Sequence, residues 1–152
     1  MSAVVRKASL ADGQHLAGMR WQWNIDAGPV TENADAFVAA FCDWMNSHTD
    51  SHVAFVAQDN DTGDAVGMAW LACLARPPDP GELDRRVGDL QSVYVVPNLR
   101  NLGVGSALIS AVVDHARGIG MERLTVTAGS RSGPLYLRHG FTAAERLLQL
   151  TL

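Results

Sequence analysis

A strand that must stop at a proline, followed by a glycine-rich turn that opens a helix, occupies the middle of this sequence. Residues 89–97, DLQSVYVVP, are rich in β-branched and aromatic residues, which favour a strand. After Gly103 and Gly105, apolar residues recur at helical spacing as far as Gly118. The first N–H groups of a helix lack internal partners, and the helix dipole makes that end attractive to anions. The segment therefore predicts a strand-to-helix turn that can hold a phosphate, with the charge of Arg100 at its rim.

Three classes of phosphorylated ligand use turns of this kind. A P-loop needs a lysine after its last glycine, whereas Ser106 and Ala107 follow Gly105. A dinucleotide-binding turn needs a third glycine, where Leu108 stands, and an acidic residue near the end of the next strand, where LTVTAGS supplies none. Two readings are left: a carrier such as coenzyme A, whose arm would run along the preceding strand, and a plain structural turn.

The remaining segments predict a single domain over residues 1–152 that mixes strands and helices. Ser9 and Asp12 form a capping-box pattern before a first helix, and the stripe from Phe37 to Met45 marks a second. Further strands are expected at 3–8, 52–58, 65–75 and 122–128, a Pro-rich loop at 76–84, a short helix at 134–140 and a strand-like tail at 147–152.

Composition narrows the classes of function. Twelve Lys and Arg against 16 Asp and Glu give a net charge of -4, which argues against a nucleic-acid partner and suits a cationic or neutral substrate. No apolar stretch is long enough to cross a membrane, so a cytoplasmic location is expected. Cys42 and Cys73 lie in apolar segments without nearby metal-ligand spacing, which predicts two buried thiols and no metal site.

Two motifs, in the same order along the chain, resemble those of the GNAT superfamily of N-acetyltransferases. VYVVPNLRNLGVGSALI, residues 93–109, is similar to the acetyl-CoA motif of that family, through the arginine and the two glycines described above. LYLRHGF, residues 135–141, is similar to the family's Leu-Tyr-x-x-x-Gly-Phe signature, with Tyr136, Gly140 and Phe141 in register. The resemblance implies an α/β (α+β) fold in which about four helices flank a central mixed, mostly antiparallel sheet of six to seven strands.

The resemblance also implies which residues hold acetyl-CoA. The backbones of Val93 and Val95 would bind the pantetheine arm and the thioester oxygen, and the glycine turn would bind the pyrophosphate. Ser130 stands near a position where the family often has a coenzyme-binding asparagine. The full expected set is Val93, Val95, Arg100, Leu102, Gly103, Val104, Gly105, Ser106 and Ser130.

Two residues are candidates for the chemistry. Tyr136 matches the family's general acid, although a tyrosine in a short helix also serves as core packing. Asp89, at the head of its strand, stands where some members carry a catalytic glutamate. Because aspartate is one methylene shorter, a water relay would be needed, and the alternative is an ordinary solvated strand end. For the acceptor pocket we expect Trp21 as an aromatic wall, with Asp26 and Glu32 attracting a cationic amine, whereas Trp23 fits the core stripe.

The expected function is acetyl transfer from acetyl-CoA to a primary amine of a small molecule or peptide, by direct attack in a ternary complex without a metal. The alternative is a non-catalytic acyl-CoA-binding or regulatory module of the same fold. A methyltransferase is a weaker option, since its glycine loop would follow the first strand. Exposed strand edges and the apolar tail would suit a homodimer.

Overall fold

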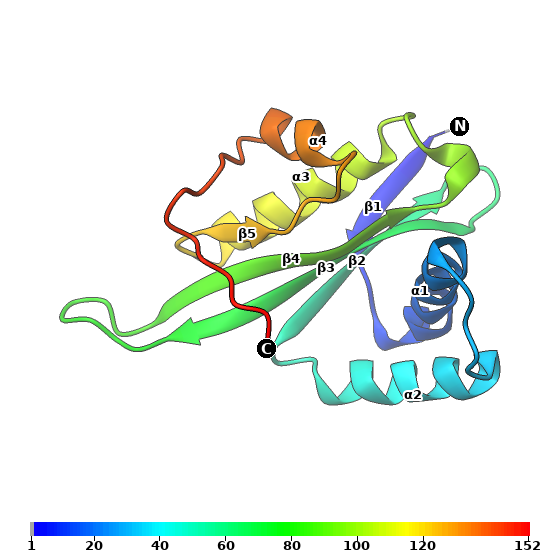
Figure 1. Ribbon diagram of the computed structural model, residues 1–152, viewed down its shortest axis with the longest axis horizontal. Coiled ribbons are helices and arrows are strands. Elements are labelled where there is room, and N and C mark those ends of the chain that lie inside the picture. Colours follow the sequence, from blue (N-terminus) through cyan, green and yellow to red (C-terminus); the bar gives the residue numbers. More distant parts are fainter. Residues whose placement is uncertain (1) are drawn as a thin grey trace.

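The computed structural model describes residues 2–152, and its strands and helices as far as α4 follow the expected order (Figure 1). The elements are β1 (Ala3–Lys7), α1 (Gly13–Ala27), α2 (Ala34–Ser47), β2 (His52–Asp59), β3 (Ala65–Arg76), β4 (Arg85–Val95), α3 (Val104–Gly118), β5 (Leu124–Val126) and α4 (Gly133–Arg138). Short 3₁₀ turns at Leu10–Asp12 and Pro97–Leu99 precede α1 and α3.

The strands form one mixed sheet in the order β1-β2-β3-β4-β5. The first three pairs are antiparallel, and β4 and β5 are parallel. The expectation of a mixed, mostly antiparallel sheet with about four helices is confirmed. The expected six to seven strands are wrong, since residues 2–152 form five.

The difference in strand number lies in part at the C-terminal tail, residues 147–152, which forms no strand. Its leucines alternate as in a strand, but a strand also needs a neighbour to complete its hydrogen-bond ladder. In Figure 1 the tail runs across the direction of β5 and ends apart from α4. The alternating pattern was therefore insufficient to predict a strand, because pairing depends on where the tail lies in space.

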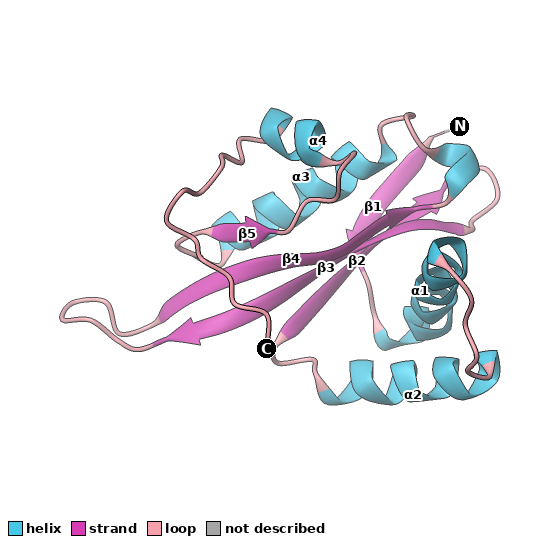
Figure 2. Ribbon diagram, viewed as in Figure 1, coloured by secondary structure: helices cyan, strands magenta, loops and turns pink. Residues whose placement is uncertain are grey.

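Helices cover both faces of the sheet (Figure 2). α1 and α2 pack on one face, where Leu16, Met68 and Trp70 belong to one buried cluster. α3 packs on the other face, where Leu71 and Leu108 belong to a second cluster. β3 and β4 continue past the ends of their neighbours as a two-stranded arm, whose tip is the exposed loop 77–84.

A partly buried ion pair fixes the turn before α1. Both oxygens of Asp12 accept hydrogen bonds from the Arg6 guanidinium, at 2.9 and 2.8 Å, and the backbone N–H of Ser9 donates to Asp12 Oδ2 at 2.8 Å. The hydrogen bond from Arg6 is the largest cause that lowers the pKa of Asp12 from 3.8 to about 2. A carboxyl whose pKa falls on folding stabilises the fold above its unfolded pKa, and this stabilisation is lost as the pH falls towards 2.

We expect Asp12→Asn to lower the free energy of unfolding at pH 7 by about 1–2 kcal/mol. This is less than the full pKa shift of Asp12 corresponds to, because Arg6 is partly exposed and solvent screens the pair. The deficit relative to the wild type should shrink as the pH falls from about 4 towards 2, because wild-type Asp12 then becomes protonated. Urea denaturation across this pH range measures it. Asp84→Asn, which breaks the exposed pair with Arg86, is the matched control and should change stability by less than about 0.5 kcal/mol.

Candidate active site

The sheet opens where β4 and β5 part. The parallel pairing ends at Leu90 opposite Val126, whereas β4 continues to Val95. Among the described residues, no strand lies beside that last part of β4 on the β5 side. A cavity of about 820 Å³ occupies the opening, and its walls come from β4, the turn before α3, the segment after β5, and α4. Parting of the strands therefore leaves backbone N–H and C=O groups of β4 available to a ligand.

A β-bulge lies at the same place in β4. Met68 of β3 lies opposite Tyr94, and Trp70 lies opposite Gln91, so β4 has one residue more than β3 in this interval. Ser92 accommodates the extra residue with a φ of 52°, a left-handed conformation that serine seldom adopts. A bulge bends its strand and redirects side chains. Here it directs Ser92 to the cavity wall at the point where β5 ends.

The glycine turn forms the adjoining wall. Gly103 caps α3 with a φ of 86°, which is a conformational reason for glycine at this position, and Gly105 lies in the first turn of the helix. Both line the cavity. Arg100 also lines it, and its Nε donates to the backbone oxygen of Val95 at 2.9 Å. The turn thus presents a helix start and a positive charge on the same side as the unpaired end of β4.

Two further arginines on the cavity wall were missed from the sequence. Arg131 follows β5, and Arg138 ends α4; both are exposed and line the cavity. With Arg100 they give the opening a cationic rim on a protein of net charge -4. A signal existed for Arg138, because it lies within the LYLRHGF motif, but nothing local to Arg131 distinguished it from a surface residue.

Of the other residues expected to bind the coenzyme, some line the cavity and some do not. Val93, Val95 and Ser106 line the cavity. Leu102, Val104 and Ser130 do not: Leu102 is largely exposed, the Val104 side chain is buried in the core, and the neighbours of Ser130 form the wall in its place.

Ser106 also links α3 to the segment after α4. Its Oγ lies 2.7 Å from Nε2 of the half-buried His139. The contact helps to hold the helix that carries Tyr136 against the helix that begins at the glycine turn.

Tyr136 lies on α4 and lines the cavity. Its side chain is buried, and its ring meets Phe141 edge to face with centroids 5.6 Å apart. Burial raises the pKa of Tyr136 above its usual value of 10. The phenol therefore keeps its proton at neutral pH, which is the form that can donate a proton to a leaving group.

Asp89 does not line this cavity. It lies in the paired part of β4, where Thr125 Oγ1 donates to Oδ1 at 2.7 Å and Gln91 Nε2 donates to Oδ2 at 3.0 Å. Both oxygens therefore already accept hydrogen bonds. The structure does not bring Asp89 and Tyr136 to the same wall, and any role of Asp89 as a base requires the intervening water that the sequence suggested.

The residues expected for the acceptor pocket separate in space. Trp23 lines the cavity and stacks on Tyr94 with ring centroids 5.8 Å apart, whereas Trp21 packs against Phe37 outside it. Residues two apart on a helix point to different sides, so the assignment of Trp21 to the cavity wall is corrected. Trp23 packs against the core cluster as expected and also lines the cavity. Asp26 accepts a hydrogen bond from Gln22 at 2.8 Å, and its other oxygen lies 3.5 Å from the Tyr94 hydroxyl.

Glu32 is exposed between α1 and α2 and does not line the cavity. Cys42 and Cys73, expected to be buried, are both half-buried free thiols, and burial raises the pKa of Cys73. Residues 2–152 contain no group of three or more His, Cys, Asp or Glu side chains placed to hold a metal ion. None of the helices in the described part of the chain combines the length and apolar character needed to span a bilayer.

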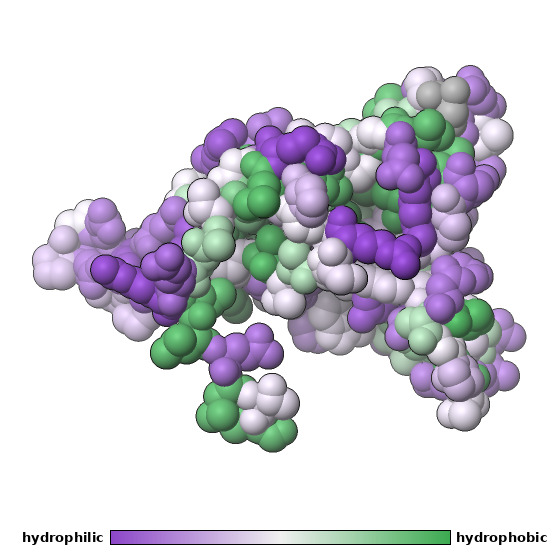
Figure 3. All heavy atoms as spheres, turned by 45° about the horizontal axis from the view of Figure 1, so that its top comes forward, coloured by the Kyte–Doolittle hydropathy of each residue, from purple (hydrophilic) through white to green (hydrophobic). Residues whose placement is uncertain are grey.

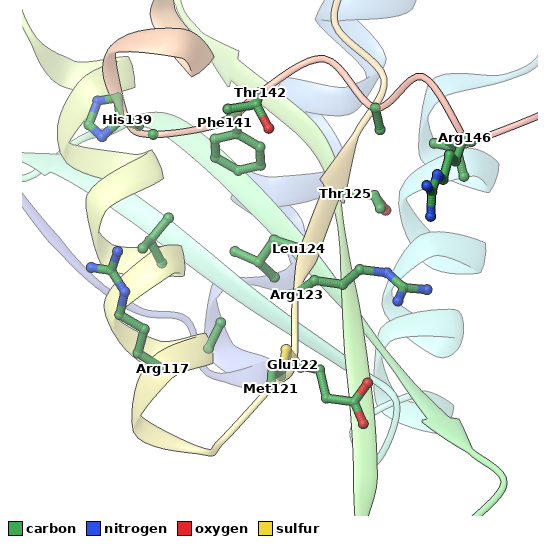
Figure 4. Close-up of a pocket in the computed structure, with 15 residues that line it drawn as sticks. Arg117, Met121, Glu122, Arg123, Leu124, Thr125, His139, Phe141, Thr142 and Arg146 are labelled. Atoms are coloured by element: carbon green, nitrogen blue, oxygen red, sulfur yellow. The ribbon is translucent and has the colours of Figure 1, made fainter.

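A second cavity, of about 650 Å³, lies between α3, β5 and the segment after α4 (Figure 4). Leu124 and Phe141 form part of its apolar wall, and the Arg117 and Arg146 side chains flank it. It includes neither the glycine turn nor Tyr136. Of the two cavities, the one beside β4 therefore contains both Tyr136 and the glycine turn.

Parallel strands that part beside a glycine-capped helix, with a cationic rim and a protonated tyrosine in the same cavity, define a class of domain that can hold an extended phosphorylated carrier. The chain belongs to the acetyltransferase (GNAT) family, whose model matches residues 17–141.

Two curated relatives bear specific names. Over 91 residues the chain is 34% identical to glucosamine 6-phosphate N-acetyltransferase of Trypanosoma brucei brucei, covering 60% of each protein. Over 156 aligned positions it is 33% identical to mycothiol acetyltransferase of Sanguibacter keddieii, covering 94% of this chain and 48% of that protein. The chain thus spans between about half and three fifths of the length of these relatives.

The fold is shared with solved structures. A predicted acetyltransferase of Clostridium acetobutylicum, crystallised with acetyl-CoA, matches with a TM-score of 0.79 at 20% identity, over 99% of this chain and 96% of that one. At this identity the likeness concerns the fold.

Proposed function

We propose that this protein transfers an acetyl group from acetyl-CoA to a primary amine of a small molecule or peptide, by direct attack in a ternary complex. The observation that carries the proposal is that Tyr136, the glycine turn and the unpaired end of β4 line one cavity. Membership of the acetyltransferase family and the names of the two relatives support it.

The residues present suit the cosubstrate. Backbone N–H groups at Gly103 and Gly105 would bind the pyrophosphate, and the exposed Arg131 and Arg138 would complement the phosphate charges. The amide-bearing pantetheine arm requires backbone partners, and β4 beyond Leu90, which pairs with β3 but has no strand on its β5 side, offers them. The thioester of acetyl-CoA supplies the activated acyl group.

The chemistry then requires one bond exchange and two proton movements. The uncharged amine nitrogen forms a bond to the thioester carbonyl carbon, and the carbon–sulfur bond breaks. Tyr136 donates its phenolic proton to the departing sulfur. The amine nitrogen loses a proton to water. Because Asp89 does not line the cavity, it can act as the base only by accepting the proton from such a water. Neither Cys42 nor Cys73 lines the cavity, which favours direct attack over an acyl-enzyme.

Measurement of thiol release from acetyl-CoA across a panel of amines tests the proposal. We expect release that depends on one class of amine, with stoichiometric formation of the acetylated amine detected by mass spectrometry. The panel includes amino acids, amino sugars and their phosphates, polyamines, aminoglycosides and peptide N-termini.

The placement of Asp89 outside the cavity favours the alternative, an acyl-CoA-binding module. Acetyl-CoA binding measured by calorimetry, without turnover of any amine in the panel, would contradict the enzymatic proposal and support the module. A protein that neither binds acetyl-CoA nor acetylates any amine would contradict both the enzymatic proposal and the binding module.

A homodimer is also proposed, and a cytoplasmic location stays a prediction. Within the described residues β5 is an edge strand, and the tail exposes Leu147, Leu148, Leu150 and Leu152. Figure 3 shows apolar atoms that project beyond the lower edge of the molecule. Unpaired strand edges and exposed apolar residues favour association between copies. Light scattering of the full chain tests it, and a monomer at all concentrations would contradict it.

A further inference from the structure

Arg20, which forms no ion pair with a carboxylate within residues 2–152, lies beside the part of the cavity wall formed by Ser92 and Trp23. We propose that Arg20 recognises an acidic group, a carboxylate or a phosphate, on the acceptor amine. This inference rests on the proposed function and narrows its substrate class from amines in general to small amines that also carry an acid.

Arg20 lies on α1 and contacts two residues of the cavity wall, Ser92 and Trp23. Its Nη1 donates to Ser92 Oγ at 3.1 Å, and its guanidinium carbon lies 4.8 Å from the ring centroid of Trp23. Both Ser92 and Trp23 line the cavity. The cation is therefore in contact with the wall at the bulge, where β4 parts from β5.

Residues of β4 that line the cavity make contacts on the two opposite faces of the sheet. Val93 and Val95 pack with the cluster under α3, on the side of the glycine turn and Tyr136. Ser92 and Tyr94 of β4 contact the α1 residues Arg20 and Trp23, respectively, on the opposite face of the sheet. A carrier held at the glycine turn would present its acyl group at the edge of β4, so the acceptor would approach from the side of α1, beside Arg20.

The charge of Arg20 is not neutralised by an ion pair within residues 2–152. Arginines 6, 85 and 86 pair with carboxylates, whereas Arg20 forms a hydrogen bond to a neutral hydroxyl and stacks on an aromatic ring. Arg20 is half-buried, which removes part of the water that would otherwise solvate it. A partly desolvated guanidinium with free N–H groups suits the paired oxygens of a carboxylate or a phosphate.

This placement changes the expectation from the sequence that Asp26 and Glu32 attract a cationic amine. Of the two acidic residues expected to attract such an amine, Glu32 lies outside the cavity wall and Asp26 is exposed and held by Gln22. The charged side chain in contact with Ser92 and Trp23 on this side of the wall, Arg20, is positive. An acceptor with one amino group and one acidic group matches it better than a polyamine does.

Matched pairs of amines test the inference by comparing kcat/KM within each pair. Glycine is compared with glycinamide, and 2-aminoethyl phosphate with ethanolamine. We expect the wild type to favour the acid-bearing member at least tenfold in one pair. Arg20→Gln should reduce that preference at least tenfold while changing kcat/KM for the neutral member less than threefold, and Arg20→Lys should keep part of the preference.

Two variants separate recognition from support of the bulge. Ser92→Ala removes the hydrogen bond but keeps the charge, so the preference for the acid should survive. Arg86→Gln removes a positive charge from the distant β3–β4 arm and should not change kcat/KM for either member of a pair. An equal loss for both members in Arg20→Gln and in Ser92→Ala would show that Arg20 only holds the bulge. An unchanged preference in Arg20→Gln, or a wild type that favours the neutral member, would also overturn the inference.

A binding measurement without turnover keeps this inference separate from the proposed function. N-acetylglycine and N-acetylglycinamide are titrated by calorimetry into protein saturated with coenzyme A. Tighter binding of N-acetylglycine that is lost in Arg20→Gln supports the inference even if no amine is acetylated. Turnover of amines with equal binding of the two products refutes the inference and leaves the acetyltransferase proposal intact.

Discussion

Replacing Tyr136 by phenylalanine is expected to lower kcat for acetyl transfer by about 10²- to 10⁴-fold, the usual contribution of a positioned general acid. The ring, its burial and its contact with Phe141 remain, so the dissociation constant of acetyl-CoA should stay within about twofold. Rapid measurement of thiol release gives kcat, and calorimetry gives the dissociation constant.

The pH dependence follows from the raised pKa of Tyr136. An acid acts only while it is protonated, and a pKa above 10 keeps the phenol protonated through neutral and mildly alkaline pH. Titration of this group should therefore not limit kcat until the pH exceeds 10. A loss of kcat near pH 7 that disappears in Tyr136→Phe would contradict the raised pKa.

The protein offers a matched control in its other tyrosine, Tyr94. Its ring is also buried, but it does not line the cavity. Tyr94→Phe makes the same chemical change on the opposite face of β4, and we expect it to change kcat less than about fivefold. If Tyr136→Phe has an equally small effect, Tyr136 is a packing residue and the departing sulfur takes its proton from water.

Replacing Gly105 by valine is expected to raise the dissociation constant of acetyl-CoA at least about 100-fold. A Cβ at this position makes ordinary contacts, at 3.5 Å from Leu135 Cδ2 and 3.8 Å from Val95 Cγ2, and the backbone is helical. The fold should therefore tolerate valine, but its methyl groups would occupy the cavity where a pyrophosphate approaches the first N–H groups of α3.

Gly118→Val is the control for this change. Gly118 ends the same helix, and its Cβ would meet nothing within 4 Å. Calorimetry with coenzyme A should show unchanged binding for Gly118→Val and loss for Gly105→Val, with similar melting temperatures for both variants. Unchanged binding in Gly105→Val would mean that the turn is structural and that the pyrophosphate lies elsewhere. Gly103 is less suited to this test, because its φ of 86° would add backbone strain to any substitution.

Local patterns predicted the junction at the centre of the site. Pro97 ends the run of strand-forming residues, and the glycines and helical spacing after it indicate where α3 starts. Neighbours along a strand alternate between its faces, which accounts for the burial of Tyr94 on the face opposite to Val93 and Val95.

Other features could not be predicted because they depend on contacts between distant segments. The leucine alternation at 147–152 predicted a strand, but the structure provides it with no neighbour. Trp23 met the spacing of a core residue and packs against the core cluster, but its place in the cavity lining beside Tyr94 became visible only in the folded chain. Asp89 occupies the expected strand, but its bonds to Thr125 and Gln91 became visible only in the folded chain.

The sequence by itself determined most of the elements and the strand-to-helix junction before α3, because each depends on residues close together in the chain. The role of Tyr136 as an acid stays a prediction from the family motif. The tertiary structure decided where β4 parts from β5, how the bulge turns Ser92, and that Arg20 meets Ser92 across 72 positions of sequence. These features arise from strand register and packing, which bring together residues that no local pattern relates.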